Sequence, residues 1–70
     1  MRYLIVIEKA ATGFSAYSPD LPGCVSTGST HDEIEKNIRE AIEFHVAGFR
    51  QEGYELPLPS TYSIYVDVPA

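Results

Sequence analysis

The first apolar stretch of the chain, residues 2–8, is rich in β-branched and aromatic residues and predicts a β-strand. Side chains alternate between the two faces of a strand, and both faces are apolar here. One face carries Tyr3, Ile5 and Ile7, and the other face carries Leu4 and Val6. Such a strand is usually central in its sheet and covered on both sides. The rest of the pattern predicts a single helix, which covers one side only, so we expect a second chain to cover Leu4 and Val6.

Two shorter strands follow. Residues 14–18 alternate in polarity and predict the second strand, which Pro19 ends because proline has no backbone N–H to donate. Residues 24–27 are long enough for a short third strand, which ends at a glycine. The connection at residues 9–13 also ends in a glycine and indicates a hairpin between the first two strands.

The strongest local signal is a helix start at Thr30-His31-Asp32-Glu33. In this capping box the Thr30 hydroxyl accepts a hydrogen bond from the Glu33 amide, and the Glu33 carboxylate accepts one from the Thr30 amide. Apolar-stripe residues then recur at steps of three and four, as in a helix with one buried face: Ile34, Ile38, Ala41, Ile42, His45, Val46 and Phe49. Gly53 is placed to follow the helix end, so the predicted helix has about 22 residues.

The end of the chain predicts a link and a last strand. Residues 56–59, Leu-Pro-Leu-Pro, suit neither a helix nor a central strand and indicate an extended link. Beyond the link, four apolar residues alternate with Ser63, Tyr65 and Asp67, and Pro69 ends the pattern. The four are Tyr62, Ile64, Val66 and Val68.

The predicted element order is therefore β-β-β-α-β in one domain spanning residues 1–70, because a chain this short cannot support two cores. A right-handed crossover through the helix would place the fourth strand parallel to the first and beside it. The expected fold class is α+β: a mostly antiparallel four-stranded sheet of order 3-2-1-4 with one helix on one face.

Composition narrows the possible partners. Ten acidic residues against five Lys and Arg give a formal charge of −5, which repels nucleic acid, so we expect no direct binding to DNA or RNA. The same charge suits a basic protein partner, although an acidic surface also simply favours solubility. The apolar N-terminal run is too short for a signal peptide or a membrane span, which indicates a cytoplasmic protein with no membrane association.

Self-association is expected from the small size of the chain. A domain of 70 residues has a modest core, and its one cysteine cannot form an internal disulfide. No cluster of metal-ligand residues replaces that stabilisation, which leaves a dimer or a tetramer. Leu4, Val6 and Tyr65 are the candidate interface residues. Tyr65 lies opposite the apolar face of the last strand, and tyrosines on strands either mark interfaces or only reflect strand propensity.

Residues 17–24, Tyr-Ser-Pro-Asp-Leu-Pro-Gly-Cys, form a corner between two predicted strands. Prolines reduce the entropy lost on docking, so a rigid corner is suited to contact a partner. A plain turn explains the same residues, because proline ends a strand and aspartate caps local backbone. The two interpretations are compatible and both stay open. The candidate partner contacts are Tyr17, Pro19, Asp20, Leu21, Pro22 and Tyr65.

No pattern indicates catalysis, a cofactor or a metal. Cys24 has no histidine or basic residue within several positions that would lower its thiol pKa, so a small buried residue is the better interpretation. His31 and His45 lie about 21 Å apart along the predicted helix, too far to share a metal or a proton relay. The acidic residues are dispersed, whereas two-metal hydrolysis needs several carboxylates that converge. We therefore expect a protein that is not an enzyme.

Three motifs in this element order carry a resemblance to a known family. They are a first strand containing Tyr-Leu-Ile-Val-Ile, the run Phe14–Cys24 with its Pro-Asp-Leu-Pro-Gly-Cys element, and Gly28-Ser29-Thr30 before an acidic helix start. The combination covers nearly the whole chain and resembles the HicB family of antitoxins. The resemblance implies a cut-down ribonuclease H fold that self-associates and masks a small basic RNA-cleaving toxin, HicA.

Many HicB proteins continue into a C-terminal DNA-binding segment, whereas this sequence ends at Ala70 after the last predicted strand. We expect DNA binding to be absent or supplied by another component. Two other functions stay open: a stand-alone homo-oligomeric binding or scaffold domain without a toxin, and a vestigial nuclease that would require divalent metal. A small basic reading frame beside the gene would favour the antitoxin, and a lone gene the scaffold.

Overall fold

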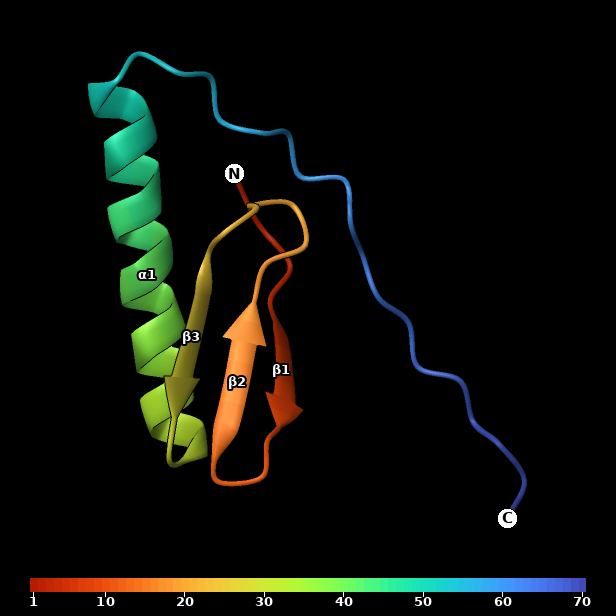
Figure 1. Ribbon diagram of the computed structural model, residues 1–70. Coiled ribbons are helices and arrows are strands. Elements are labelled where there is room, and N and C mark those ends of the chain that lie inside the picture. The colour runs from red at the N-terminus through yellow and green to blue at the C-terminus, as the bar shows by residue number, and fades with distance from the viewer.

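The computed structural model describes all 70 residues of the chain. Three short strands precede one long helix: β1 (Val6–Lys9), β2 (Phe14–Tyr17), β3 (Val25–Gly28) and α1 (His31–Gln51). The strands form one sheet in the order β1-β2-β3, and both neighbouring pairs are antiparallel. Because α1 packs against β2 and β3, β1 is the edge strand on the side away from the helix (Figure 1).

The prediction of a four-stranded sheet is wrong. Residues 54–70, the C-terminal tail, form neither helix nor strand, so the sheet has three strands and the element order is β-β-β-α. Figure 1 shows the tail passing the sheet and then running away from the rest of the molecule. Alternating side chains set the two faces of an extended segment, but a strand also needs a neighbour that completes its backbone hydrogen bonds. β1 is consequently an edge strand and not the predicted central one.

The core is small and lies between α1 and the inner face of the sheet. Five apolar residues are buried there: Ala16, Leu21, Cys24, Ile34 and Ile38. Five more pack around them and are partly buried: Tyr3, Ile5, Phe14, Ala41 and Ile42. The helical stripe read from the sequence therefore does face the sheet, and Ile34, at 0% exposure, is its most buried residue.

The helix begins after Thr30 as predicted. The Thr30 hydroxyl accepts a hydrogen bond of 3.1 Å from the Glu33 amide. The return contact differs from the expectation, since the Glu33 carboxylate accepts from the amide of Ser29 at 3.0 Å and not from that of Thr30. One bond satisfies the Glu33 amide in the first helical turn and the other satisfies the Ser29 amide just before the helix. An N-cap of this kind contributes about 1 kcal/mol.

The helix ends in a Schellman motif at Gly53, which takes a φ of 75° that other residues rarely adopt. The Gly53 amide donates to the carbonyl of Arg50, and the Tyr54 amide donates to that of Phe49. The rings of Phe49 and Tyr54 meet edge to face at 6.0 Å, which supplies the apolar contact that accompanies this motif. The predicted position of Gly53 just beyond the helix is confirmed.

The end of β3 lies very close to the first turn of α1. A Cβ at Gly28 would come within 2.7 Å of the Ile34 nitrogen and 2.9 Å of its Cα. The side-chain amide of Asn37 also donates to the carbonyl of Thr27 at 2.9 Å. This close approach fixes the helix on the inner face, so the outer face of the sheet is left without a covering layer.

Candidate protein-interaction site

The corner between β2 and β3 is folded inward. The Leu21 amide donates to the Ser18 carbonyl, and the Cys24 amide donates to the Leu21 carbonyl, which closes two successive turns. Leu21 is 1% exposed and belongs to the core, so its side chain is not available to a partner. Pro19 and Pro22 are exposed on the outside of the corner. The corner therefore serves the fold through Leu21 while its two prolines remain free for contact.

Asp20 is the residue of this corner with the most hydrogen bonds. Its carboxylate accepts bonds from the amide and hydroxyl of Ser60 at 3.2 and 3.1 Å, and from the amide and hydroxyl of Thr61 at 3.2 and 2.8 Å. The bond from the Thr61 hydroxyl is the main cause that holds the pKa of Asp20 below its ordinary value, since it favours the charged form. Asp20 thus anchors the start of the tail, forty residues away in the sequence.

A second contact holds the tail nearby. The hydroxyl of Tyr3 donates a hydrogen bond of 2.6 Å to the carbonyl of Pro57. Together, Tyr3 and Asp20 tie residues 57–61 to the sheet, one at the segment before β1 and the other at the corner. We call this pair of contacts the tail anchor.

The outer face of the sheet carries a row of apolar side chains. Val6 pairs with Tyr17, and Tyr17 pairs with Val25, so the three lie side by side. Ala16 points into the core, so its neighbour Tyr17 points the other way. Tyr17 and Val25 are 38% and 68% exposed, while Leu4 and Val6 are partly buried within this chain. Val6, Tyr17 and Val25, here called the outer row, form an apolar surface next to the prolines of the corner.

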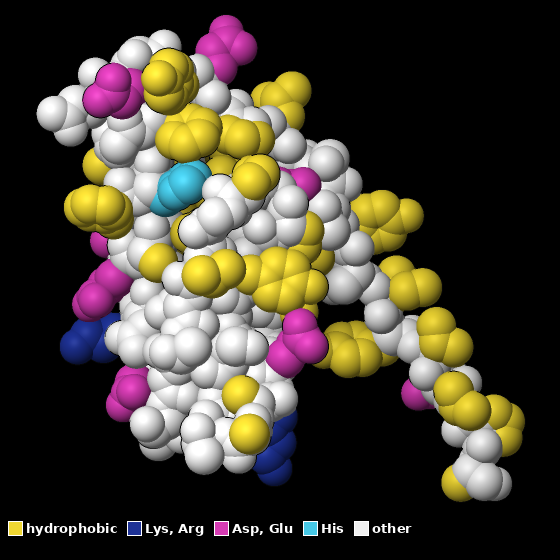
Figure 2. All heavy atoms as spheres, in the orientation of Figure 1, with side chains coloured by type: hydrophobic (Ala, Val, Ile, Leu, Met, Phe, Trp, Pro, Cys, Tyr) yellow, Lys and Arg dark blue, Asp and Glu magenta, His cyan; other side chains and the backbone are white.

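The tail beyond its anchor makes no contact that buries it. Every residue from 62 to 68 is exposed, and Tyr65, the predicted contact with another chain, is as exposed as a free side chain. Figure 2 shows hydrophobic side chains standing out along this part of the tail. Residues 62–68 are called the arm below.

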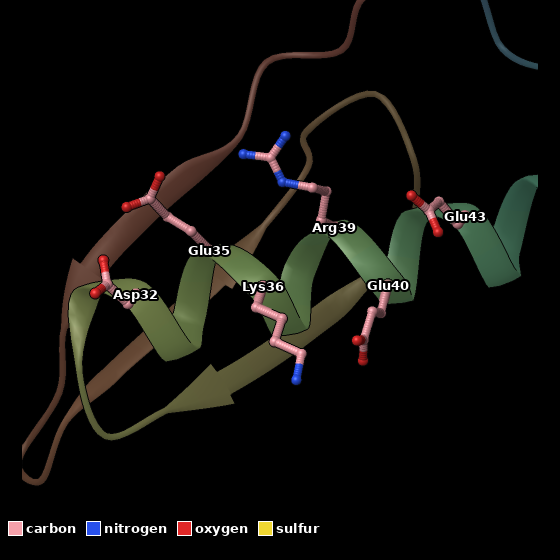
Figure 3. A pocket seen from close by; sticks show the side chains of 6 residues that line it. All are labelled: Asp32, Glu35, Lys36, Arg39, Glu40 and Glu43. Carbon is pink, nitrogen blue, oxygen red and sulfur yellow. The ribbon is translucent and has the colours of Figure 1, made fainter.

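The solvent-facing side of α1 is mixed in charge. Four acidic and two basic side chains line a shallow depression there: Asp32, Glu35, Lys36, Arg39, Glu40 and Glu43. Figure 3 shows them spreading outward from the helix on several sides, with no common point toward which they converge. No group of three or more His, Cys, Asp or Glu side chains is arranged to hold a metal ion. This side of α1 contributes acidic charge to the surface, but its side chains are not arranged to bind a metal ion.

The environments of Cys24, His31 and His45, the side chains that could act as a nucleophile or a base, suit structural roles. Cys24 is a buried free thiol whose pKa is raised by desolvation, which confirms it as a core residue. His31 is exposed and its ring meets that of Phe14 edge to face at 4.5 Å. His45 is partly buried beside Phe49, and its Nε2 has no hydrogen-bond partner. Separately, α1 falls short of the apolar character needed to cross a membrane.

Two features of the surface were missed in the sequence. The sequence predicts Val25 only as part of a short strand, whereas the pairing register places it beside Tyr17. No sequence pattern predicts the hydrogen bonds from Ser60 and Thr61 to Asp20, because serine and threonine next to prolines indicate only a turn. A signal was available: a strand register that brings Val6, Tyr17 and Val25 to the same face could have been chosen from the alternation of apolar residues in each strand.

Comparison with known proteins identifies similar chains along the full length. Residues 3–70 match a family profile described as the HicB-like antitoxin of bacterial toxin–antitoxin systems. The chain is 41% identical over 69 residues to a 14.9 kDa protein in the rep-hol intergenic region of Haemophilus phage HP1, covering 99% of this chain and 52% of that one. It is 31% identical to Antitoxin HicB 2 of Photorhabdus laumondii, covering 100% of this chain and 51% of that one. The chain thus spans about half the length of these two relatives.

Other relatives have a similar length or a solved structure. A UPF0150 protein of Thermoplasma acidophilum, Ta0767, is 31% identical, with 94% of this chain and 97% of that protein covered. A chain in a structure described as the HicA3 and HicB3 toxin-antitoxin complex is 40% identical, with a TM-score of 0.72. The likeness covers 84% of this chain and 70% of that one. These matches extend the likeness from sequence to fold.

Proposed function

This chain belongs to the family of HicB-like antitoxins of bacterial toxin–antitoxin systems, and from that premise we propose that it binds and neutralises a small basic toxin of the HicA type. The observation that carries the proposal is the 40% identical chain of similar fold found in a HicA3–HicB3 complex. Neutralisation here means occupation of the toxin surface by this chain, with no chemical step.

The outer row and the corner prolines are the proposed toxin-binding surface. Tyr17 and Val25, with the partly buried Val6 beside them, offer exposed apolar area, and Pro19 and Pro22 stand beside it as rigid contacts. An aromatic side chain at the centre of such a patch is typical of residues that dominate binding energy. We therefore assign Tyr17 as the main toxin contact.

The negative charge supports the choice of a basic partner. A formal charge of −5 attracts a basic protein at long range and accelerates their encounter, an effect that salt screens. The raised pKa of the buried Cys24 thiol and the dispersed carboxylates of α1 support a role without catalysis. We further propose a cytoplasmic location, consistent with a free buried cysteine, and self-association as part of the function. The implied likeness to ribonuclease H stays a prediction.

The test uses a basic HicA-type protein in a form without its RNA-cleaving activity. We expect a stable complex whose association rate falls as salt is added. Tyr17→Ala should weaken the affinity by at least about tenfold, because it removes the central aromatic contact. Phe44→Ala is the matched control: Phe44 is 84% exposed on α1, away from the sheet, and its loss should change affinity less than about twofold. Absence of binding at low salt would refute the proposal.

A stand-alone homo-oligomeric scaffold is the second candidate. The observation that favours it is the arm, an exposed apolar segment that could contact another copy of this chain in the absence of a toxin. A lone gene without a basic neighbour, together with an oligomer that forms in the absence of any partner, would select this function over the first.

A further inference from the structure

The arm has the composition of a strand but lacks a neighbouring strand. Tyr62, Ile64, Val66 and Val68 would share one face, and all four are at least 71% exposed. Residues 62–68 contain one charged side chain and neither glycine nor proline, so nothing in them favours a turn. An exposed apolar segment with unpaired backbone groups is suited to adding to the edge of a sheet.

The sheet has two edges, β1 and β3, and β1 is the one with an apolar groove beside it. β1 pairs only with β2, so the backbone groups on its other side are free. Between β1 and α1 lies a groove of about 230 Å³ lined by four isoleucines, with Glu35 and Arg39 at its rim. The four are Ile5, Ile7, Ile38 and Ile42. The groove exists because α1 lies over β2 and β3 and leaves the inner face of β1 partly uncovered.

The tail anchor directs the arm away from its own β1. Asp20 holds Ser60 and Thr61 through four hydrogen bonds, and Tyr3 holds the carbonyl of Pro57. Pro57 and Pro59 stiffen the link between these contacts, because proline-rich segments stay extended. After Thr61 no residue favours a reversal, and the arm continues outward (Figure 1). A stiff anchored link followed by an unpaired strand is the arrangement in which chains exchange elements.

We propose that two copies of this chain exchange their arms, so that residues 62–68 of each lie along β1 of the other and place their apolar face over the isoleucine groove. The contact is reciprocal under a two-fold axis, as in most homodimers. Each copy supplies both the apolar strand and the apolar groove, so a single interface removes both exposed surfaces. The exchange specifies the self-association included in the proposed function and does not depend on toxin binding.

The first test measures the oligomeric state of the full chain by light scattering over a range of dilutions. We expect the wild-type chain to be a dimer at micromolar concentration. Ile64→Asp should raise the dissociation constant by at least about 100-fold, because it places a charge in an apolar groove. Phe44→Asp is the matched control, an equally exposed apolar residue outside the arm, and should leave the dimer unchanged. A dimer that persists unaltered in Ile64→Asp, or a wild-type chain that is monomeric, overturns the proposal.

The second test identifies which segments meet. In a Cys24→Ala background, chains carrying Glu8→Cys on β1 are mixed with differently tagged chains carrying Ser63→Cys in the arm, then unfolded and refolded together. A short thiol-specific crosslinker should join the two tagged chains to each other. Products only between Ser63→Cys chains would mean that arms pair together and would overturn the assignment to β1. A doubly substituted chain that crosslinks only within itself would overturn the exchange.

Toxin binding by Ile64→Asp separates this inference from the proposed function. A monomeric Ile64→Asp chain that still binds the HicA-type protein supports the exchange and leaves the outer row as the toxin surface. A wild-type dimer that does not bind the toxin, but dissociates on Ile64→Asp, refutes the proposed function while supporting the exchange. Loss of toxin binding with an unchanged dimer assigns the arm to the toxin and overturns the exchange.

Discussion

Two regions of this molecule, α1 and the arm, each carry a regular apolar pattern, with opposite results. Ile34, in the first turns of α1, is fully buried against β2 and β3, whereas Ile64, in the arm, is 74% exposed. Both residues belong to well-formed periodic patterns, one of period three to four and one of period two. The helix satisfies its own backbone and needs only a surface to cover, while an extended segment needs a second strand for its backbone groups. The difference shows that an apolar strand pattern predicts that a segment needs a neighbouring strand but does not specify which strand that is.

The largest expected effect comes from replacing the same residue type in the two regions. Ile34→Ala removes a fully buried side chain from a core of five residues and should lower the free energy of unfolding by about 2–5 kcal/mol. Ile64→Ala, measured on dilute chain, should change it by less than about 0.5 kcal/mol. Urea unfolding followed by circular dichroism measures both. Equal losses in the two variants would show that the arm is folded onto its own sheet.

A smaller effect is expected at two glycines, one at the end of β3 beside the start of α1 and one near the end of α1. Gly28→Ala would place a Cβ 2.7 Å from the Ile34 nitrogen and should cost about 1–3 kcal/mol, because backbone must move to make room. Gly48 lies inside α1, and a Cβ there would meet nothing within 4 Å. Gly48→Ala should therefore stabilise the chain by up to about 1 kcal/mol through its better helix propensity.

Thermal unfolding of the two glycine variants, compared with the wild type, checks these opposite signs. A neutral Gly28→Ala would mean that β3 and α1 are less tightly joined than the structure shows. Destabilisation by Gly48→Ala would mean that this part of the helix is covered by another chain, and it would extend the interface beyond the arm.

The smallest effect concerns the tail anchor and its pH dependence. The Thr61 hydroxyl and the other bonds to Asp20 hold its pKa below the ordinary value of 3.8, so the anchor favours the charged carboxylate. The stabilisation is therefore present above pH 3.8 and is lost as the pH falls through the lowered pKa. Amide chemical shifts of Ser60 and Thr61 should move toward random-coil values with a midpoint below 3.8. Asp20→Ala should show these shifts at all pH values, and a midpoint above 3.8 in the wild type would contradict the anchor.

The sequence was most informative where the signals are local. The capping pattern at Thr30, the apolar stripe and Gly53 placed α1 at its observed bounds, because caps and periodicity act over one or two turns. The break at Pro19 likewise agrees with the end of β2 at Tyr17. The assignment of Leu21 as a surface contact did not anticipate its burial, since a leucine in a proline-rich turn has no local feature that distinguishes an inward from an outward side chain.

The amino-acid sequence by itself determined the helix, the order of the first three strands, the negative charge and the apolar character of the arm. It predicted the first strand at residues 2–8, whereas β1 is shorter and spans Val6–Lys9. Only the tertiary structure decided that Val6, Tyr17 and Val25 form one row, that Asp20 holds Thr61, that β1 has one unpaired edge and that the arm has no neighbouring strand. Local hydrogen bonds and side-chain periodicity are fixed within a few residues of the chain. Register, long-range contacts and strand pairing depend on how whole elements pack, which no short stretch of sequence specifies.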